Sequence, residues 1–164
     1  MLLSAAAAFA ANPPFPRPLA DVLIPTPNSK AIDLKQYRGK VVLMAVISEG
    51  CTPCVNSIPM LNRAQKDFGP RGFQVIAAVG DPNGQYNLQA FQARYRPAFP
   101  MGFLIPAQIL KLGGYDPRDQ HVNVPIMIFI DRMGIVQFQV SGESPFFKNE
   151  EEQIRGTVNA LLNK

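Results

Sequence analysis

Two seven-residue segments place the strongest limits on how this 164-residue chain can fold: the run 41–47 is apolar throughout, and the run 73–79 is apolar except for Gln74. A run that is apolar throughout is typical of a strand buried on both faces, whereas a half-buried strand alternates apolar and polar residues. The segment between the runs, 51–68, has apolar residues at three- and four-residue spacing and predicts a helix. Pro59 within it predicts a kink. Strand, helix and strand in this order predict a right-handed parallel crossover, and therefore an α/β fold.

The later segments are expected to extend this sheet and to place more helices around it. The apolar pattern predicts helices over 87–96, 107–112 and 149–162, and strands over 101–105, 126–130 and 135–140. Residues 31–34 alternate like a short edge strand, and residues 81–84, which begin with Asp81, are expected to form a turn. The last two strands are joined by 131–134 as a hairpin, so the central sheet should be mixed. Asn149 is expected to cap the last helix, with three glutamates following it at the positive end of the helix dipole. This order of elements is the thioredoxin-like arrangement.

The residues before position 30 differ in composition from the rest of the chain. Residues 1–11 are almost entirely apolar, and the run is too short to cross a hydrocarbon core, which needs about 20 residues. Residues 8–10 have the small-x-small form of a cleavage site, so we interpret 1–11 as the remnant of a secretory signal. An ordinary alanine-rich helix is the alternative. The segment 12–29 is rich in proline and predicts an extended lead-in, which leaves 30–164 as the thioredoxin-like domain.

The composition excludes several classes of protein. Two cysteines and a single histidine, His121, are too few for a disulfide-dense scaffold, an all-cysteine zinc site or a multi-histidine centre, so no metal is expected. We expect His121 to lie on the surface, or in the core with its hydrogen bonds satisfied. The net charge of +4 is spread along the chain and gives no reason to expect a nucleic-acid partner. Nothing after the first 11 residues predicts a membrane span.

Both cysteines belong to one motif, Cys51-Thr52-Pro53-Cys54, at the point where a buried strand gives way to a helix. A thiol at a helix N-terminus faces unpaired backbone N–H groups and the positive end of the dipole. Both favour the thiolate, which is the nucleophile in disulfide exchange. We expect Cys51, at the more exposed first position, to attack and Cys54 to resolve. Pro53 suits the first turn because its missing N–H has no intrahelical partner there.

Further residues are expected to form the substrate site around this pair. Gly50 precedes the motif, and its lack of a side chain would leave the first sulfur accessible, while Thr52 and Pro53 separate the two cysteines. Val124-Pro125 stands immediately before a predicted strand, where the proline is a candidate for a cis peptide bond. In thioredoxin folds such a proline lies beside the dithiol, and the backbone before it pairs with the substrate chain. A trans proline that opens an edge strand is the alternative.

Several segments carry a resemblance to a known family: Asp33-Leu34, 38–43, 51–54, 58–61, 72–76, Val124-Pro125 and 129–134. In these segments the chain resembles the TlpA/ResA-like thiol-disulfide oxidoreductases, from residue 32 to the C-terminus. The resemblance implies a thioredoxin fold with a strand and helix inserted between the motif and Pro125. It also implies a periplasmic or otherwise extracytoplasmic reductase of protein disulfides, for example in cytochrome c maturation. The partners would be a disulfide-containing protein and an upstream thiol donor, and we expect a monomer.

The sequence departs from this family around the first cysteine. The family usually has a tryptophan before it, whereas this chain has Gly50 and no tryptophan. Thioredoxins carry a buried aspartate six residues before the first cysteine as a proton acceptor, and Ala45 occupies that position here. Glu49 is the nearest carboxylate in sequence, and it would replace the aspartate only if its side chain turned toward Cys54. A solvated loop glutamate is the other interpretation.

Two alternative functions remain open beside the oxidoreductase. A peroxiredoxin-like thiol peroxidase would use Cys51 as its peroxidatic residue, because Ser48-x-x-Cys51 matches the later part of that family's Pro-x-x-x-Thr/Ser-x-x-Cys motif. Met44 occupies the proline position of the motif, which counts against this hypothesis. The other alternative is a redox-inactive or metal-chaperone binding module on the same scaffold. In the leading hypothesis the only redox centre is the Cys51–Cys54 pair, without a further cofactor.

Overall fold

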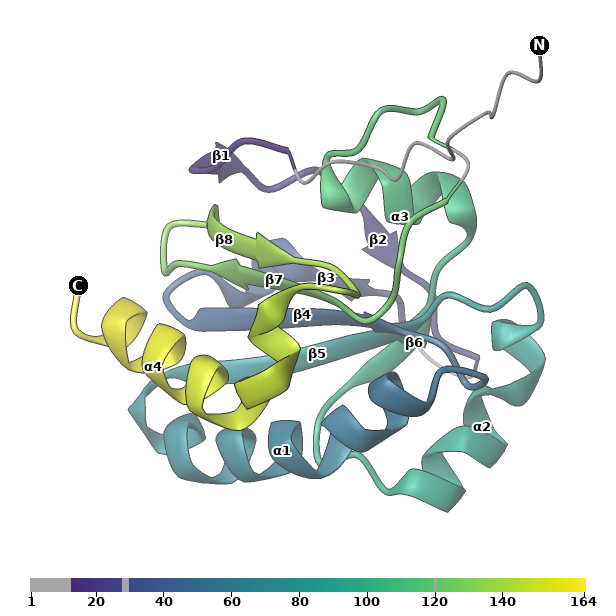
Figure 1. Ribbon diagram of the computed structural model, residues 1–164, viewed down its shortest axis with the longest axis horizontal. Coiled ribbons are helices and arrows are strands. Elements are labelled where there is room, and N and C mark those ends of the chain that lie inside the picture. Colours follow the sequence, from purple (N-terminus) through teal and green to yellow (C-terminus); the bar gives the residue numbers. More distant parts are fainter. Residues whose placement is uncertain (1–12, 28–29, 120) are drawn as a thin grey trace, which may run out of the picture.

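The computed structural model describes residues 13–27, 30–119 and 121–164, built around a six-stranded mixed sheet (Figure 1). The strands lie in the order β1-β8-β7-β4-β5-β6. Their bounds are β1 Arg17–Pro18, β4 Val41–Ile47, β5 Phe73–Val79, β6 Met101–Phe103, β7 Ile126–Ile130 and β8 Ile135–Val140. The central strand β4 pairs parallel with β5 and antiparallel with β7. The predicted mixed thioredoxin-like sheet is therefore confirmed.

Helices cover both faces of this sheet (Figure 1). Their bounds are α1 Thr52–Phe68, α2 Gly84–Tyr95, α3 Pro106–Gly113 and α4 Glu150–Leu162, with short 3-10 turns η1 Leu34–Tyr37, η2 Gly69–Arg71 and η3 Pro145–Asn149. On one face α1, α2 and α4 pack on the alternate β4 residues Leu43, Ala45 and Ile47. On the other face α3 and the N-terminal segment cover the intervening residues of β4. Burial on both faces explains why this strand is apolar throughout.

The described part of the proline-rich lead-in, residues 13–27, contains two short strands, one of which joins the central sheet. Strand β1 pairs antiparallel with β8 and lies at the edge of the sheet. The proline in β1 has no backbone N–H to donate, which an edge strand tolerates better than a central one. The Arg17 guanidinium donates to the Gly113 carbonyl at 2.9 Å and to Gln139 Oε1 at 2.6 Å, which ties the lead-in to α3 and β8. The candidate signal remnant, residues 1–11, lies outside the described residues. In the part of the chain described, no helix combines the length and apolarity needed to cross a membrane.

Some element bounds and contacts differ from the sequence prediction. The strand expected at 31–34 is β3 Ile32–Asp33, which pairs with β2 Leu23–Ile24 in a separate two-stranded sheet. Helix α2 begins three residues earlier than predicted, because the turn after β5 leads directly into it, with the Gly84 N–H donating to the Asp81 carbonyl at 2.9 Å. The capping prediction for Asn149 is wrong: it holds the N-cap position of α4 but makes no side-chain capping hydrogen bond, since η3 runs into the helix there.

Candidate active site

The two cysteines lie at the start of α1, directly after the loop that follows β4. A disulfide joins Cys51 to Cys54, with 5.2 Å between their Cα atoms. Cys51 is the N-cap residue of α1, and the backbone N–H of Cys54 donates to Cys51 Sγ at 3.2 Å. Cys54 is fully buried, whereas Cys51 is partly exposed. The accessible sulfur is therefore the one that receives a helix-start N–H, an arrangement that stabilises a thiolate.

The loop between β4 and the motif is held by Asp81, a residue that sequence reasoning treated only as part of a turn. Ser48 Oγ donates to Asp81 Oδ1 at 2.5 Å, and the Glu49 backbone N–H donates to Asp81 Oδ2 at 2.8 Å. The Cys51 N–H in turn donates to the Ser48 carbonyl at 3.3 Å. A signal for this contact was present, since Ser48 and Asp81 each follow one of two adjacent parallel strands and such strand ends meet at one edge of a sheet.

The Val124–Pro125 peptide bond is cis, as its placement before β7 predicted, and it lies beside the cysteines. The Val124 carbonyl oxygen is 3.8 Å from Cys51 Sγ. Gly142, in the loop after β8, packs against the same segment: its N–H donates to the Asn123 carbonyl at 3.1 Å. A Cβ at Gly142 would lie 2.8 Å from the Val124 oxygen. The glycine thus allows the loop after β8 to approach the proline segment, a role that the sequence did not suggest.

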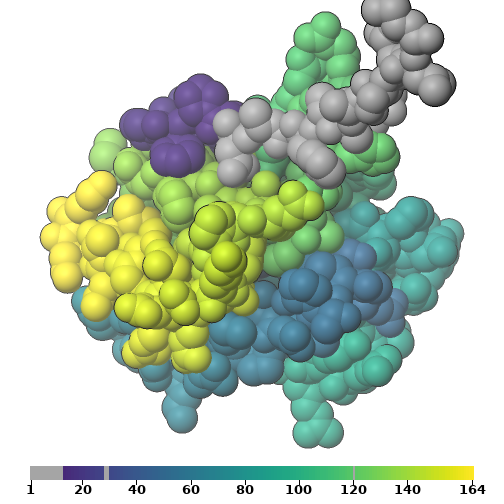
Figure 2. Space-filling view, viewed as in Figure 1, coloured from purple at the N-terminus to yellow at the C-terminus, as the bar shows by residue number. Residues whose placement is uncertain are grey.

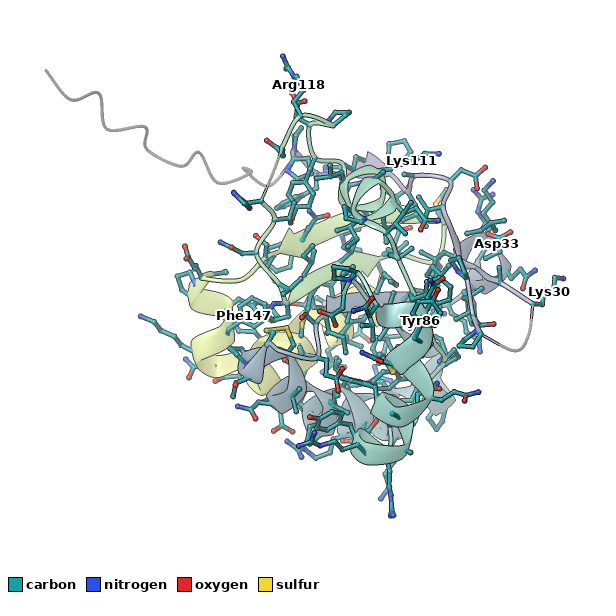
Figure 3. The ribbon with its side chains drawn as sticks, turned by 90° about the vertical axis from the view of Figure 1, so that its right-hand side faces the viewer. Lys30, Asp33, Tyr86, Lys111, Arg118 and Phe147 are labelled. Carbon is teal, nitrogen blue, oxygen red and sulfur yellow. A yellow bond between two sulfur atoms is a disulfide. The ribbon has the colours of Figure 1, made fainter. Side chains whose placement is uncertain are left out.

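Two hollows flank the exposed side of this segment, and Val124 lines both. One, of ≈ 360 Å³, lies between Pro53 at the start of α1 and Phe147 and Lys148 of η3. Figure 2 shows the segment before α4 lying against α1, and in Figure 3 the yellow disulfide lies near the labelled Phe147. The other hollow, of ≈ 270 Å³, is lined by two carboxylate residues, Asp81 and Asp119. A polypeptide that crosses Val124 would have room for a side chain on either side.

The remaining predicted site residues lie around the rim of the motif. Gly50, Thr52 and Pro53 are exposed, and a Cβ built on Gly50 would meet open space. Glu49 is partly buried and meets Asp81 through its backbone, but among the described residues no hydrogen bond or ion pair engages its carboxylate. Ala45 is fully buried in the same apolar cluster as Cys54, so the strand position behind the motif carries no acid. His121 is exposed, in agreement with one of its two predicted placements.

A buried carboxyl group comes instead from the first turn of α4. Glu150 is only 7% exposed, and burial raises its pKa, an effect that a hydrogen bond with the Ser57 hydroxyl partly opposes. Ser57 is fully buried on α1 and its Oγ donates to the Pro53 carbonyl at 3.0 Å. The sequence placed Glu150 only among the dipole-facing glutamates. The signal that it points inward is the buried stripe Ile154, Val158 and Leu161, which continues back by one turn to Glu150.

The redox centre of the site is therefore a disulfide with protein groups around it. Within the residues that the structure describes, no group of three or more histidine, cysteine, aspartate and glutamate side chains is placed to hold a metal ion. The chemistry available to the site is thiol–disulfide exchange at an accessible sulfur, with a second sulfur buried behind it.

Comparisons with known proteins agree with this geometry. Among curated relatives, the thiol-disulfide oxidoreductase ResA of Bacillus thuringiensis is 27% identical over 124 residues, which cover 76% of this chain and 68% of that protein. ResA of Bacillus anthracis is 27% identical over 134 residues, covering 82% of this chain and 70% of that protein. Among solved structures, a putative thiol:disulfide interchange protein DsbE from Chlorobium tepidum has a TM-score of 0.75 and 26% identity, covering 88% of this chain and 95% of that one.

The family model of the AhpC/TSA family matches residues 15–139, which is most of the chain and includes the cysteine motif and the cis-proline. The relatives bear out the resemblance that the motifs suggested. The chain belongs to the AhpC/TSA family and has a thioredoxin-like fold, with TlpA/ResA-like thiol-disulfide oxidoreductases among its relatives.

Proposed function

We propose that this protein is a thiol-disulfide oxidoreductase that reduces disulfides in other proteins. The observation that carries the proposal is the Cys51–Cys54 disulfide at the start of α1, with Cys51 partly exposed beside a cis-proline. Starting from the dithiol, the Cys51 thiolate attacks a substrate disulfide and forms a mixed disulfide, and one substrate sulfur leaves as a thiolate. Cys54 then attacks Cys51 Sγ. Two electrons and two protons pass from the enzyme dithiol to the substrate, which leaves as a dithiol.

The substrate chain would lie across the cis-proline segment. The Val124 carbonyl is 3.8 Å from Cys51 Sγ, so backbone pairing at Val124 would hold the substrate sulfur close to the attacking atom. The exposed residues Gly50, Thr52 and Pro53 would form the rim on which the substrate rests. The hollows on either side of Val124 would accept side chains that flank the substrate cysteine.

The proposed place of action is outside the cytoplasm, in the periplasm or an equivalent compartment. Support comes from the apolar N-terminal run with its small-x-small pattern and from relatives that are named ResA and DsbE. There the protein would receive electrons from an upstream thiol donor, act as a monomer and pass electrons to a disulfide-containing protein. Cytochrome c maturation is one process that needs such a step.

Reduction of insulin disulfides, measured as turbidity with dithiothreitol as electron source, tests the activity. The wild-type protein should accelerate the reaction, and Cys51→Ala should lose the acceleration because no nucleophile remains. Met133→Ala, at an exposed position in the turn between β7 and β8 and away from the motif, serves as the control and should keep most of the rate. Full activity in Cys51→Ala would refute the mechanism.

The peroxidase alternative has less support from the site. It relies on a serine three residues before Cys51, and the Ser48 hydroxyl is engaged by Asp81 at 2.5 Å. Rapid formation of a sulfenic acid at Cys51 with hydrogen peroxide would favour a peroxidase. Stoichiometric binding of copper by both thiols, without insulin reduction, would favour the binding module.

A further inference from the structure

We propose that Glu150 and Ser57 are positioning residues for the redox pair: the proton on the Glu150 carboxyl controls which group the Ser57 hydroxyl hydrogen-bonds, and thereby the reactivity of the two thiols. The role presupposes the proposed dithiol chemistry of Cys51 and Cys54. It assigns to α4 the carboxyl group that Ala45 on β4 does not provide.

The first support is the position of Ser57 on α1. Ser57 is three residues after Cys54 and four after Pro53, so all three lie on one side of the helix within about 6 Å between neighbouring Cβ atoms. Cys54 and Ser57 are both fully buried, which places this side against the core. The Glu150 carboxyl, which hydrogen-bonds Ser57, therefore lies about one helical turn from the resolving cysteine.

The second support is the rigid packing of α4 on α1. Two ion pairs cross between the helices: Arg63 meets Glu151 in a bidentate contact at 2.8 and 2.7 Å, and Arg155 meets Asp67 at 2.7 Å. Ile154 of α4 belongs to the same buried cluster as Cys54. The carboxyl of Glu150 is thus fixed beside the first two turns of α1 rather than free to swing into solvent.

The third support is the poor fit of Glu150 to a purely structural role. Its Oε1 atom is fully buried and has no hydrogen-bond partner in the part of the chain described. A buried carboxylate with one unpartnered oxygen is costly, and an apolar side chain would fill the same space at less cost. A group of this kind, buried beside a reactive pair, is typical of functional sites.

The charged groups on the neighbouring elements do not neutralise Glu150. They are Arg63, Lys66 and Asp67 on α1, Lys148 on η3, and Glu151, Glu152 and Arg155 on α4. The strands β4, β7 and β8 contain no ionisable side chain. Arg63 and Arg155 are committed to Glu151 and Asp67, so within the described residues no salt bridge reaches Glu150. The protonation state of the Glu150 carboxyl therefore depends mainly on its hydrogen bond with Ser57 and on the charge of the two sulfur atoms.

One peptide unit connects this carboxyl to the attacking sulfur. The Pro53 carbonyl accepts from Ser57 Oγ at 3.0 Å, and the N–H of the same peptide, on Cys54, donates to Cys51 Sγ at 3.2 Å. When the carboxyl is protonated it donates to Ser57 Oγ, and the single hydroxyl hydrogen is free for Pro53. That bond polarises the peptide and strengthens the N–H donor to sulfur. When the carboxyl is ionised it takes the hydroxyl hydrogen, and its charge also disfavours a thiolate nearby.

The direct test is the pH profile of the reduced protein, followed as the rate of Cys51 alkylation by iodoacetamide. In Glu150→Gln the amide mimics the protonated carboxyl, so the apparent thiol pKa should fall by about one unit, which is about tenfold more thiolate at pH values below it. The reduction potential in dithiothreitol buffers should become less negative. The matched control Glu152→Gln makes the same change two residues away, at an exposed glutamate of the same helix turn, and should give the wild-type profile.

A second variant separates positioning from folding. Ser57→Ala removes the hydroxyl that links the two groups, so the effect of Glu150→Gln should shrink when both changes are present. A folded Glu150→Gln protein whose alkylation profile and potential match the wild type would overturn the proposal. So would a full Glu150→Gln effect in the Ser57→Ala background, because the hydroxyl would then play no part. These readouts need no protein substrate, so failure here is distinguishable from failure to reduce insulin.

Discussion

The starts of α1 and α4 lie on the same face of the sheet, yet the sequence revealed the chemistry of only one of them. At α1 the N-cap is Cys51 and the first turn contains no acidic residue, so the positive end of the helix faces sulfur. At α4 the N-cap Asn149 makes no side-chain capping bond, and three glutamates follow, of which only Glu150 is buried. Local spacing determines the environment of Cys51, whereas the environment of Glu150 depends on how α4 docks on α1.

The largest expected effect tests the roles at the start of α1. Replacing the resolving cysteine, in Cys54→Ser, should leave the mixed disulfide with substrate unresolved, because the second attack on Cys51 Sγ cannot occur. Replacing the attacking cysteine, in Cys51→Ser, should give no covalent complex. Incubating each reduced variant with a disulfide-bonded peptide and measuring intact mass under non-reducing conditions checks this. A complex with Cys51→Ser but not with Cys54→Ser would reverse the assigned roles.

A second prediction compares the loops that lead to the two helices, since each contains a glycine near the cysteines. Gly142→Ala should destabilise the protein by about 1–3 kcal/mol, because the new Cβ would press on the Val124 carbonyl and force the proline segment to shift. Gly50→Ala should change stability by less than about 0.5 kcal/mol, since its Cβ meets open space. Urea unfolding measures both.

The same pair has a functional readout. The insulin-reduction rate should fall in Gly142→Ala more than in Gly50→Ala, because only Gly142 contacts the segment beside Cys51. Equal rates in the two variants would show that access past Gly50 matters as much as the position of Val124.

Most of the fold followed from the sequence because its strongest signals are local. The two predominantly apolar seven-residue runs became β4 and β5 at the predicted bounds, and the hairpin at 131–134 joined β7 to β8. The prediction of strand pairing failed where contacts between segments distant in sequence determine the structure. The pairing of β3 with β2 instead of the sheet edge was not foreseen, because a two-residue strand carries no pattern that selects its neighbour.

The candidate site divides in the same way. The cysteine pair and the cis-proline were predictable, since both are tied to the ends of strongly apolar strands. Asp81 and Gly142 act through backbone and loop contacts between segments far apart in sequence, so no short motif marks them. The burial of Glu150 could have been predicted from the sequence. Extending the buried stripe of Ile154 and Val158 by one helical turn toward the N-terminus places Glu150 on the buried face, although a charged residue is normally expected on the surface.

A third prediction uses the raised pKa of Glu150 to separate it from its neighbours. The folded state holds this proton more tightly than the unfolded chain, so the stabilisation is complete below about pH 4.5 and is lost as the pH rises through the raised folded value. Glu150→Gln should therefore be more stable than the wild type at neutral pH, and the difference should narrow on acidification. Chemical unfolding at a series of pH values measures it; a constant difference would contradict the assignment.

The smallest expected effect is that of a change at Glu151, the next residue of α4. At neutral pH this change should lower stability, whereas Glu150→Gln should raise it. Hydrogen bonding to Arg63 lowers the pKa of Glu151, so the pair contributes stability that is present above about pH 4.5 and is lost as the pH falls through the lowered value. Glu151→Gln should lower Tm slightly at neutral pH, because exposed ion pairs contribute little. The loss should vanish at about 1 M salt, where charges are screened within about 3 Å. A salt-independent loss would mean that Glu151 acts through packing, and a gain in Tm would mean that it shares the buried environment of Glu150.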